Sequence, residues 1–225
     1  VAAGAVAAGG EVKATEKRQV EGGGRVVRTS ALTLWSVLER AWTALGFDDV
    51  SDDAFRAVVL ARVVEPVSKA DTLRVLDEVG VAGPSLRTIF RALGRCVKRD
   101  YRGLLASACL RHSTRSGPLS LVLYDVSTLH FGVEHEDRLR KVGMSKERRV
   151  DPQVQLGLLC DPSGFPLEVC CFEGNKAETR TLLPVLTAFT ERHHVRDMVV
   201  VADAGMLSAS SLNAIADAGF SFIVG

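Results

Sequence analysis

Long apolar runs and cysteines at C-x-x-C spacing are both missing from this sequence of 225 residues. Without a run of about 18 apolar residues, no membrane-spanning helix is expected. The five cysteines show no C-x-x-C spacing, and the adjacent Cys170 and Cys171 would point to opposite faces of a strand. We therefore interpret the cysteines as reduced thiols of a cytoplasmic protein. The apolar first ten residues lack the positive charge that precedes a signal-peptide core, and we interpret residues 1–29 as a flexible leader.

Extremes of composition are missing as well. The chain is 47% hydrophobic and 24% charged, which are proportions of globular proteins and exclude a disordered, collagen-like or coiled-coil chain. Its length allows one large domain or two small ones. The net charge of +1 conceals a difference between halves, because residues 1–117 carry 18 Lys and Arg against 13 Asp and Glu, whereas residues 118–225 carry 10 against 14. A basic half followed by an acidic half favours a polyanion-binding part joined to a part with another role.

Residues 30–117 are predicted to form a small helical region. Apolar residues recur at helical spacing, and Ser, Asp, Gly and Pro residues mark the expected helix ends. The expected helices run from Ser30 as N-cap to Gly46, from Ser51 to Pro66, from about 69 to 79, and from Ser85 to near His112.

The last of these helices carries Arg87, Arg91 and Arg95 at i, i+4 and i+8. From Val81 to Gly117 there are eight Lys and Arg residues and a single acid, Asp100. Guanidinium groups in a stripe on a helix that follows a tight turn suit contact with DNA phosphates and docking in a groove. A solvated helix face accounts for the same pattern equally well.

Residues 118–225 are predicted to form an α/β layer on a mixed sheet. The turn sequence Asp161-Pro162-Ser163-Gly164 joins two of the expected strands into a hairpin. The expected strands are 121–131, 153–160, 165–172, 198–202 and 220–224, and the expected helices are 179–194 and 208–218. The fourth strand is entirely apolar, which is typical of a strand covered on both faces.

Two carboxylates follow directly on apolar runs of predicted strands. Asp125 ends an apolar run that begins at Leu121, and Asp203 follows the run Val199–Ala202. An acid in such a place is costly to desolvate unless a group such as a divalent metal compensates it. If the two strands are parallel neighbours, both acids converge at the carboxyl edge of the sheet and can share Mg²⁺ ions. The alternative is that both are ordinary acids at strand ends.

Several short motifs occur together in one order in the second half. They are Tyr124-Asp125-Val126-Ser127-Thr128-Leu129-His130-Phe131, Gly143-Met144-Ser145-Lys146, Gly157-Leu158, Gly164-Phe165-Pro166, Glu173-Gly174-Asn175 and Val201-Ala202-Asp203-Ala204-Gly205-Met206. In order and spacing they resemble the DDE transposases of bacterial insertion sequences, above all the insertion-sequence type 4 group. Residues 30–117 are similar to the helical N-terminal region of that group, through Glu65-Pro66-Val67-Ser68-Lys69 and Pro84-Ser85-Leu86-Arg87-Thr88-Ile89-Phe90.

The resemblance implies an α/β fold, namely an incomplete RNase H-like mixed sheet preceded by a small all-helical domain. Residues 30–117 would then serve in DNA binding and dimerisation, and residues 118–225 would be the N-terminal part of the catalytic domain. Asp125 and Asp203 would be catalytic and would hold two Mg²⁺ or Mn²⁺ ions. The third acid of the family is a Glu on a later helix; no position here matches it, so we expect a chain truncated before that residue.

The resemblance also implies a reaction and its partners. The expected reaction is metal-dependent DNA cleavage followed by strand transfer, without a covalent protein intermediate. The partners would be terminal inverted repeats and target DNA, bound by a homodimer in the cytoplasm at the nucleoid. Lys146, Arg148 and Arg149 would hold the DNA backbone, although neighbouring acids such as Glu136 and Asp137 cancel part of the charge of this loop.

Two other readings stay open from the sequence. One is a truncated transposase remnant that binds DNA and is catalytically inactive. The other is a phosphatase of the haloacid dehalogenase type, because Asp125 ends a strand; it is disfavoured because Ser127 occupies the position where that family has a second Asp.

Overall fold

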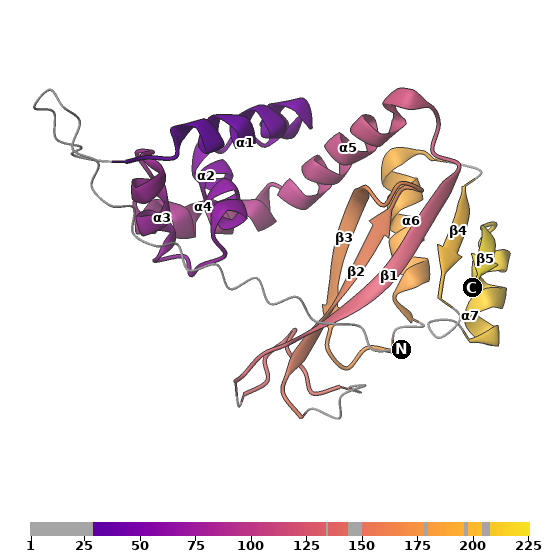
Figure 1. Cartoon of the computed structure of the whole chain (residues 1–225). Coiled ribbons are helices and arrows are strands. Elements are labelled where there is room, and N and C mark those ends of the chain that lie inside the picture. The colour runs from indigo at the N-terminus through magenta and orange to yellow at the C-terminus, as the bar shows by residue number, and fades with distance from the viewer. Residues whose placement is uncertain (1–28, 134, 144–149, 178–179, 196–197, 204–207) are drawn as a thin grey trace, which may run out of the picture.

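The computed structural model describes residues 29–133, 135–143, 150–177, 180–195, 198–203 and 208–225. A helical part comes first, and a five-stranded sheet with two further helices follows it (Figure 1). Helix α5 packs against strand β3 and so joins the helical part to one edge of the sheet. Within the described ranges, no helix is both long enough and apolar enough to cross a membrane.

The helical part is built around aromatic side chains from four of its elements. Its elements are α1 (Leu32–Ala44), η1 (Phe47–Val50), α2 (Asp53–Val64), α3 (Thr72–Val79), α4 (Leu86–Lys98), α5 (Tyr101–Ser113) and η2 (Thr114–Ser116). The ring of Trp42 meets Phe47 and Phe55 edge-on, with centroids 5.2 and 6.1 Å apart, and Phe55 meets Tyr101 at 5.1 Å. These edge-to-face contacts add to the free energy of burying the rings.

Most of the predicted helix ends are confirmed. Asp52 caps α2 by accepting a hydrogen bond from the backbone N–H of Phe55, Ser85 caps α4 through Thr88, and Gly80 ends α3 in the left-handed conformation. The prediction for Ser30 was wrong, because Ala31 occupies the N-cap position of α1, without a side-chain hydrogen bond.

The long helix predicted from Ser85 to near His112 is in fact two helices. The chain turns at Asp100, whose φ of 46° lies in the left-handed region. Its carboxylate accepts a hydrogen bond from the backbone N–H of Gly103 and so caps α5. The one acid in this basic segment therefore separates α4 from α5.

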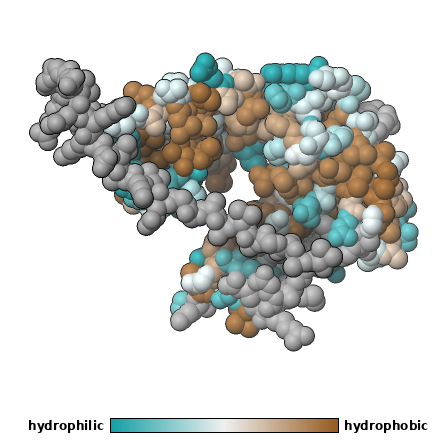
Figure 2. Space-filling model, viewed as in Figure 1, coloured by the Kyte–Doolittle hydropathy of each residue, from teal (hydrophilic) through white to brown (hydrophobic). Residues whose placement is uncertain are grey.

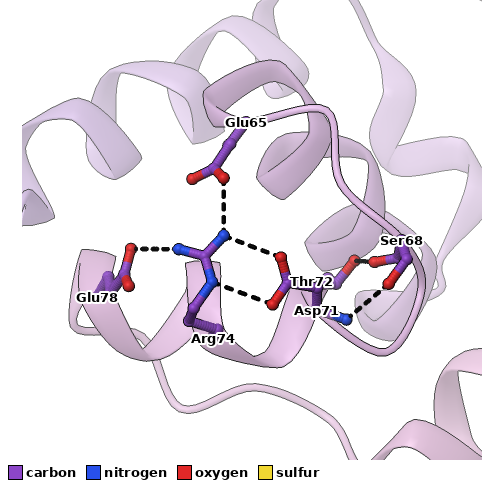
Figure 3. A network of polar contacts seen from close by, with 6 residues as sticks. All are labelled: Glu65, Ser68, Asp71, Thr72, Arg74 and Glu78. Atoms are coloured by element: carbon purple, nitrogen blue, oxygen red, sulfur yellow. Dashed lines mark hydrogen bonds and ion pairs between the residues drawn. The ribbon is translucent and has the colours of Figure 1, made fainter.

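A four-residue ionic network fixes α3 to the end of α2 (Figure 3). The Arg74 guanidinium donates to Glu65 at 2.7 Å, to Glu78 at 2.8 Å and to both carboxylate oxygens of Asp71. Hydrogen bonding to Arg74 holds the pKa of Asp71 below its ordinary value. Ser68 adds a turn, since its hydroxyl accepts from the backbone N–H of Asp71. Glu65 and Ser68, which belong to the sequence motif of residues 65–69, therefore make structural contacts with residues of α3 and its N-cap.

The sheet has the strand order β3-β2-β1-β4-β5. Its strands are β1 (Leu121–His130), β2 (Gln153–Cys160), β3 (Pro166–Glu173), β4 (Val199–Ala202) and β5 (Ser221–Val224). Strands β1, β2 and β3 pair antiparallel, whereas β4 runs parallel to both β1 and β5. The predicted α/β fold class is confirmed, since helices precede a mixed sheet.

Two helices, α6 (Leu182–His193) and α7 (Ala209–Asp217), pack on one face of this sheet. Val122, Tyr124, Val200 and Ala202 are buried beneath them, whereas the alternate residues of β1 and β4 are partly or fully exposed. The expectation that the fourth strand is covered on both faces is therefore not met within the described residues. On the side seen in Figure 2, apolar side chains gather both over the helical part and over the sheet.

Candidate functional site: two carboxylates on neighbouring parallel strands

The two acids singled out in the sequence come together on the neighbouring inner strands β1 and β4, at the carboxyl end of β4. Tyr124 of β1 is paired with Ala202 of β4 in parallel register. Asp125 and Asp203 each follow directly on these residues, and therefore occupy the next position along two neighbouring parallel strands. Adjacent strands in a sheet are about 4.8 Å apart, so this register brings the two carboxylates within reach of one ligand.

Both acids belong to the open face of the sheet. Side chains alternate between faces along a strand, and the residues before Asp125 and Asp203 point into the core under α6. The structure corrects one premise of the sequence argument, because both acids are exposed to solvent rather than desolvated. A polymeric substrate can therefore reach both carboxylates, and neither carboxylate is a buried charge that a metal would have to compensate.

The donor set suits a hard divalent cation. Mg²⁺ is usually bound through one or two carboxylates, with waters and substrate phosphates completing its coordination. Asp125 and Asp203 supply two carboxylates on one face, which fits that pattern. Within the described ranges no group of three or more His, Cys, Asp or Glu side chains is placed to hold a metal. Any further ligands would therefore come from outside this set, such as water or phosphate.

The three arginines predicted to bind DNA differ in their surroundings. Arg87 and Arg91 are exposed on α4, whereas Arg95 donates two hydrogen bonds to Asp52 at 2.7 and 2.8 Å. The Asp52 side chain is only 4% exposed and also accepts from the Tyr101 hydroxyl. The hydrogen bonds from Arg95, with those from Tyr101 and the backbone of Phe55, lower the pKa of Asp52 to about 2 despite its burial. Arg95 thus links α4 to the start of α2.

The basic loop between β1 and β2 is partly neutralised by its own acids. Lys146, Arg148 and Arg149 lie outside the described residues, so their role stays a prediction. Nearer to β1, Arg140 pairs with Asp137 at 2.7 Å and Lys141 with Glu136 at 3.2 Å. Hydrogen bonds from the backbone of Arg140 and Leu139 and from the Arg140 side chain lower the pKa of Asp137 to about 2.

Gln153 and two glycines of the sequence motifs hold this loop against the sheet. Gln153 is fully buried and donates from its side-chain amide to the carbonyl of Gly174 at 2.7 Å. Lys141 and Gln153 exchange two backbone hydrogen bonds, and a Cβ added to Gly143 or Gly174 would collide with backbone atoms. These glycines are therefore required by a close approach of three chain segments.

An apolar cavity of about 660 Å³ lies between the helical part and the sheet. Its lining includes Phe55, Val97 and Leu105 from the helices and Leu158 and Val169 from the sheet. Glu168 also lines it, but this carboxylate is paired with Arg192 of α6. Since Leu158 is paired with Asp125, the cavity adjoins the carboxylate pair without including it.

Comparison with known proteins gives a family match for the second half of the chain. Residues 117–225 match the sequence model of a family described as "Transposase DDE domain". The match covers just under half of the chain, so residues 117–225 are similar to a DDE transposase domain. A search of curated proteins finds no match.

Solved structures of transposases are similar at low sequence identity. A piggyBac transposase synaptic complex with hairpin DNA is 12% identical, with a TM-score of 0.42, and the match covers 81% of this chain and 40% of that one. A Mos1 transposase paired-end complex with the left transposon end is 11% identical, with a TM-score of 0.32 and coverages of 91% and 61%. A Mos1 mariner paired-end complex with Mn is 12% identical, with a TM-score of 0.31 and the same coverages. This chain thus spans 40% to 61% of the length of these proteins.

Sequence reasoning missed one set of functional candidates. Lys176 and Arg180 were not singled out, although they lie with Arg138 around a single groove in the structure. Arg138 is separated from the other two by the whole β2–β3 hairpin, so periodicity along one helix or strand could not have grouped them.

Proposed function

We propose that this chain acts in DNA transposition, as a transposase of an insertion sequence of the type 4 group that cleaves and transfers DNA strands with the help of divalent metal. The observation that carries the proposal is the register of β1 and β4, which sets Asp125 beside Asp203 on an open sheet face. The family match over residues 117–225 supports the reaction class.

The role proposed for Asp125 and Asp203 is to hold Mg²⁺ or Mn²⁺, in a site for two ions, through carboxylate oxygens. Metal bound there would supply Lewis-acid stabilisation of the charge that develops on attacking and leaving oxygens of a phosphodiester. The exposure of both acids leaves room for a DNA strand to approach, and the parallel pairing of β1 and β4 up to Tyr124 and Ala202 brings the two acids side by side.

DNA would also bind at α4 of the helical part. Arg87, Phe90, Arg91, Gly94 and Lys98 are all exposed and recur at the spacing of one helix face. Arg87 and Arg91 form no ion pair with other described residues, so their charge is available to phosphates. Arg95 would act indirectly by fixing α4 to α2 through Asp52. In this proposal the ligands are terminal inverted repeats and target DNA, the DNA-bound form is a homodimer, and the location is the nucleoid.

A cleavage assay tests the catalytic part of this proposal. The chain is incubated with terminal-repeat DNA and Mg²⁺ or Mn²⁺, and nicked product is measured for the wild type, Asp125→Asn and Asp203→Asn. We expect each substitution to lower the rate by at least about 100-fold, because even residues that only support metal ligands contribute about 10- to 100-fold. Asp217→Asn, which changes an exposed acid on α7, is the matched control and should cleave normally.

Metal binding provides a readout that does not depend on cleavage. The electron paramagnetic resonance signal of free Mn²⁺ is titrated with protein, and the two carboxamide variants should bind fewer ions than the wild type and Asp217→Asn. DNA binding without cleavage and without Mn²⁺ binding would instead identify the chain as the inactive DNA-binding remnant.

A further inference from the structure

A groove at the far end of β3 gathers three cationic side chains from two separate loops. It has a volume of about 760 Å³, and its lining includes Arg138 from the β1–β2 loop and Lys176 and Arg180 from the segment between β3 and α6. Glu173 is the one acid among the described residues that line it. Asn175 adds a polar amide to the same surface. We call the surface formed by these five residues the basic groove.

No acid in the described ranges forms an ion pair with a cation of the basic groove. Among the described residues, the nearby Asp137 and Glu136 are already paired with Arg140 and Lys141. Arg138 and Arg180 are exposed and form no ion pair with any residue that the structure describes. The ammonium group of Lys176 lies 4.7 Å from the ring centroid of Phe172, which holds it in place while leaving its charge unpaired.

One wall of the basic groove lies on the same face of the sheet as the carboxylate pair, whereas Phe172, over which Lys176 lies, belongs to the face that α6 covers. Asp125 is paired with Leu158 and Leu158 with Val169, and residues directly opposite each other in a sheet share a face. Cys171 and Glu173 lie two and four residues beyond Val169, on the same face of β3. Glu173 is four residues along and two strands across from Asp125. Standard strand dimensions therefore put this end of the groove roughly 16 Å from Asp125.

We propose that the basic groove binds the phosphate backbone of the DNA that flanks the bond to be cleaved. This inference rests on the proposed function, because it takes Asp125 and Asp203 as the place of cleavage. Guanidinium groups bind phosphate oxygens through paired N–H donors. Three charges from two loops can contact several phosphates along a backbone rather than one small anion. At about 3.4 Å of helix rise per base pair, the groove would contact the duplex about five base pairs from the cleaved phosphate.

The experiment measures DNA affinity without metal. A fluorescein-labelled duplex oligonucleotide is titrated with the chain in EDTA at salt concentrations between about 50 and 200 mM, and log K is plotted against log salt. For Arg138→Gln/Arg180→Gln we expect weaker binding and a slope reduced by about 1.8, since each lost phosphate contact removes about 0.9. Both side chains are exposed, so thermal unfolding should match that of the wild type.

A matched control separates local contact from total charge. Arg62→Gln/Lys69→Gln removes two positive charges from exposed positions at and beyond the end of α2, far along the chain from the groove. Its salt slope should equal that of the wild type. An unchanged slope in Arg138→Gln/Arg180→Gln, or an equal change in both double variants, would overturn the inference.

The outcomes also distinguish a failure of the groove proposal from a failure of the cleavage proposal. If Asp125→Asn abolishes nicking while the groove variants bind DNA like the wild type, the groove is refuted and the cleavage site stands. If the salt slope falls as expected and no nicking occurs with Mg²⁺ or Mn²⁺, the groove stands and the cleavage proposal fails.

Discussion

Gly143 lies directly against the backbone carbonyl of Gly174, two positions that are 31 residues apart in the chain. A Cβ at either position would come closer to backbone atoms than real Cβ atoms do, and Gln153 is the third member of this contact. Backbone cannot move aside as a flexible side chain can, so the contact requires glycine at both positions. It ties the loop after β1 to the end of β3, beside the basic groove.

We therefore predict that Gly143→Ala and Gly174→Ala each destabilise the protein by about 1–3 kcal/mol, the usual cost of overpacking. Urea unfolding followed by circular dichroism measures this difference. Gly94→Ala is the matched control, because a Cβ at this exposed helix position meets nothing within 4 Å. That change should stabilise the protein by about 0.5–1 kcal/mol, since alanine favours helix. Equal effects at positions 94 and 174 would contradict the packing argument.

We predict that the protein loses stability in acid because the Asp52 and Asp161 carboxylates become protonated. Hydrogen bonding from Arg95 is the largest cause that lowers the pKa of Asp52 from 3.8 to about 2. Burial raises the pKa of Asp161, but hydrogen bonds from Ser113, Ser163 and Phe165 outweigh it and bring this pKa to about 2 as well. A folded-state pKa below the unfolded one means stabilisation that is complete above about pH 5 and lost as the pH falls from about 4 to 2.

The measurement is the urea midpoint between pH 7 and pH 2. We expect Asp52→Asn to lower stability at pH 7 by about 1–3 kcal/mol, because hydrogen bonds to charged groups contribute this much. The same variant should show a weaker fall below pH 4 than the wild type, since the titrating group is gone. Asp53→Asn, at an exposed acid in the first turn of α2, is the control. A wild-type acid profile in Asp52→Asn would refute the assignment.

We predict that single and double variants of the Glu168–Arg192 pair lower the free energy of unfolding by different amounts. The Glu168 side chain is 2% exposed and that of Arg192 27%, and hydrogen bonding to Glu168 raises the pKa of the arginine. Arg192→Met leaves a buried carboxylate without its partner and should cost about 3 kcal/mol. Glu168→Met/Arg192→Met should recover most of that loss, because an apolar pair of similar volume replaces both charges. Additive losses in the double-mutant cycle would show that the pair is not coupled.

Local sequence signals predicted much of the fold. The strand predicted over 153–160 is β2 to the residue, and the helix predicted from Ser51 is α2, with the next residue, Asp52, as its N-cap. These features depend on residues close together in the chain, where turn and capping preferences act. The parallel register of Asp125 and Asp203 was expected as one possibility and required the structure to settle, because strand order is a long-range property.

Long-range side-chain contacts could not be predicted from the sequence. The spacing of Arg87, Arg91 and Arg95 indicated one helix face but not that Arg95 pairs with a carboxylate 43 residues earlier. The exposure of Asp125 was also missed, because an apolar strand indicates burial of the strand without stating which face is covered.

Asp100 offers a test of how one residue divides a helical segment. Its left-handed backbone and its hydrogen bond to the Gly103 N–H, at 3.2 Å, together end α4 and begin α5. Asn accepts the same bond and tolerates this conformation, so Asp100→Asn should be nearly neutral. Asp100→Gly loses the cap but relieves the backbone and should cost a few tenths of a kcal/mol. Asp100→Ala loses both and should cost about 1–2 kcal/mol. Urea unfolding gives this ranking, and an alanine variant as stable as the asparagine variant would show that neither the cap nor the turn matters.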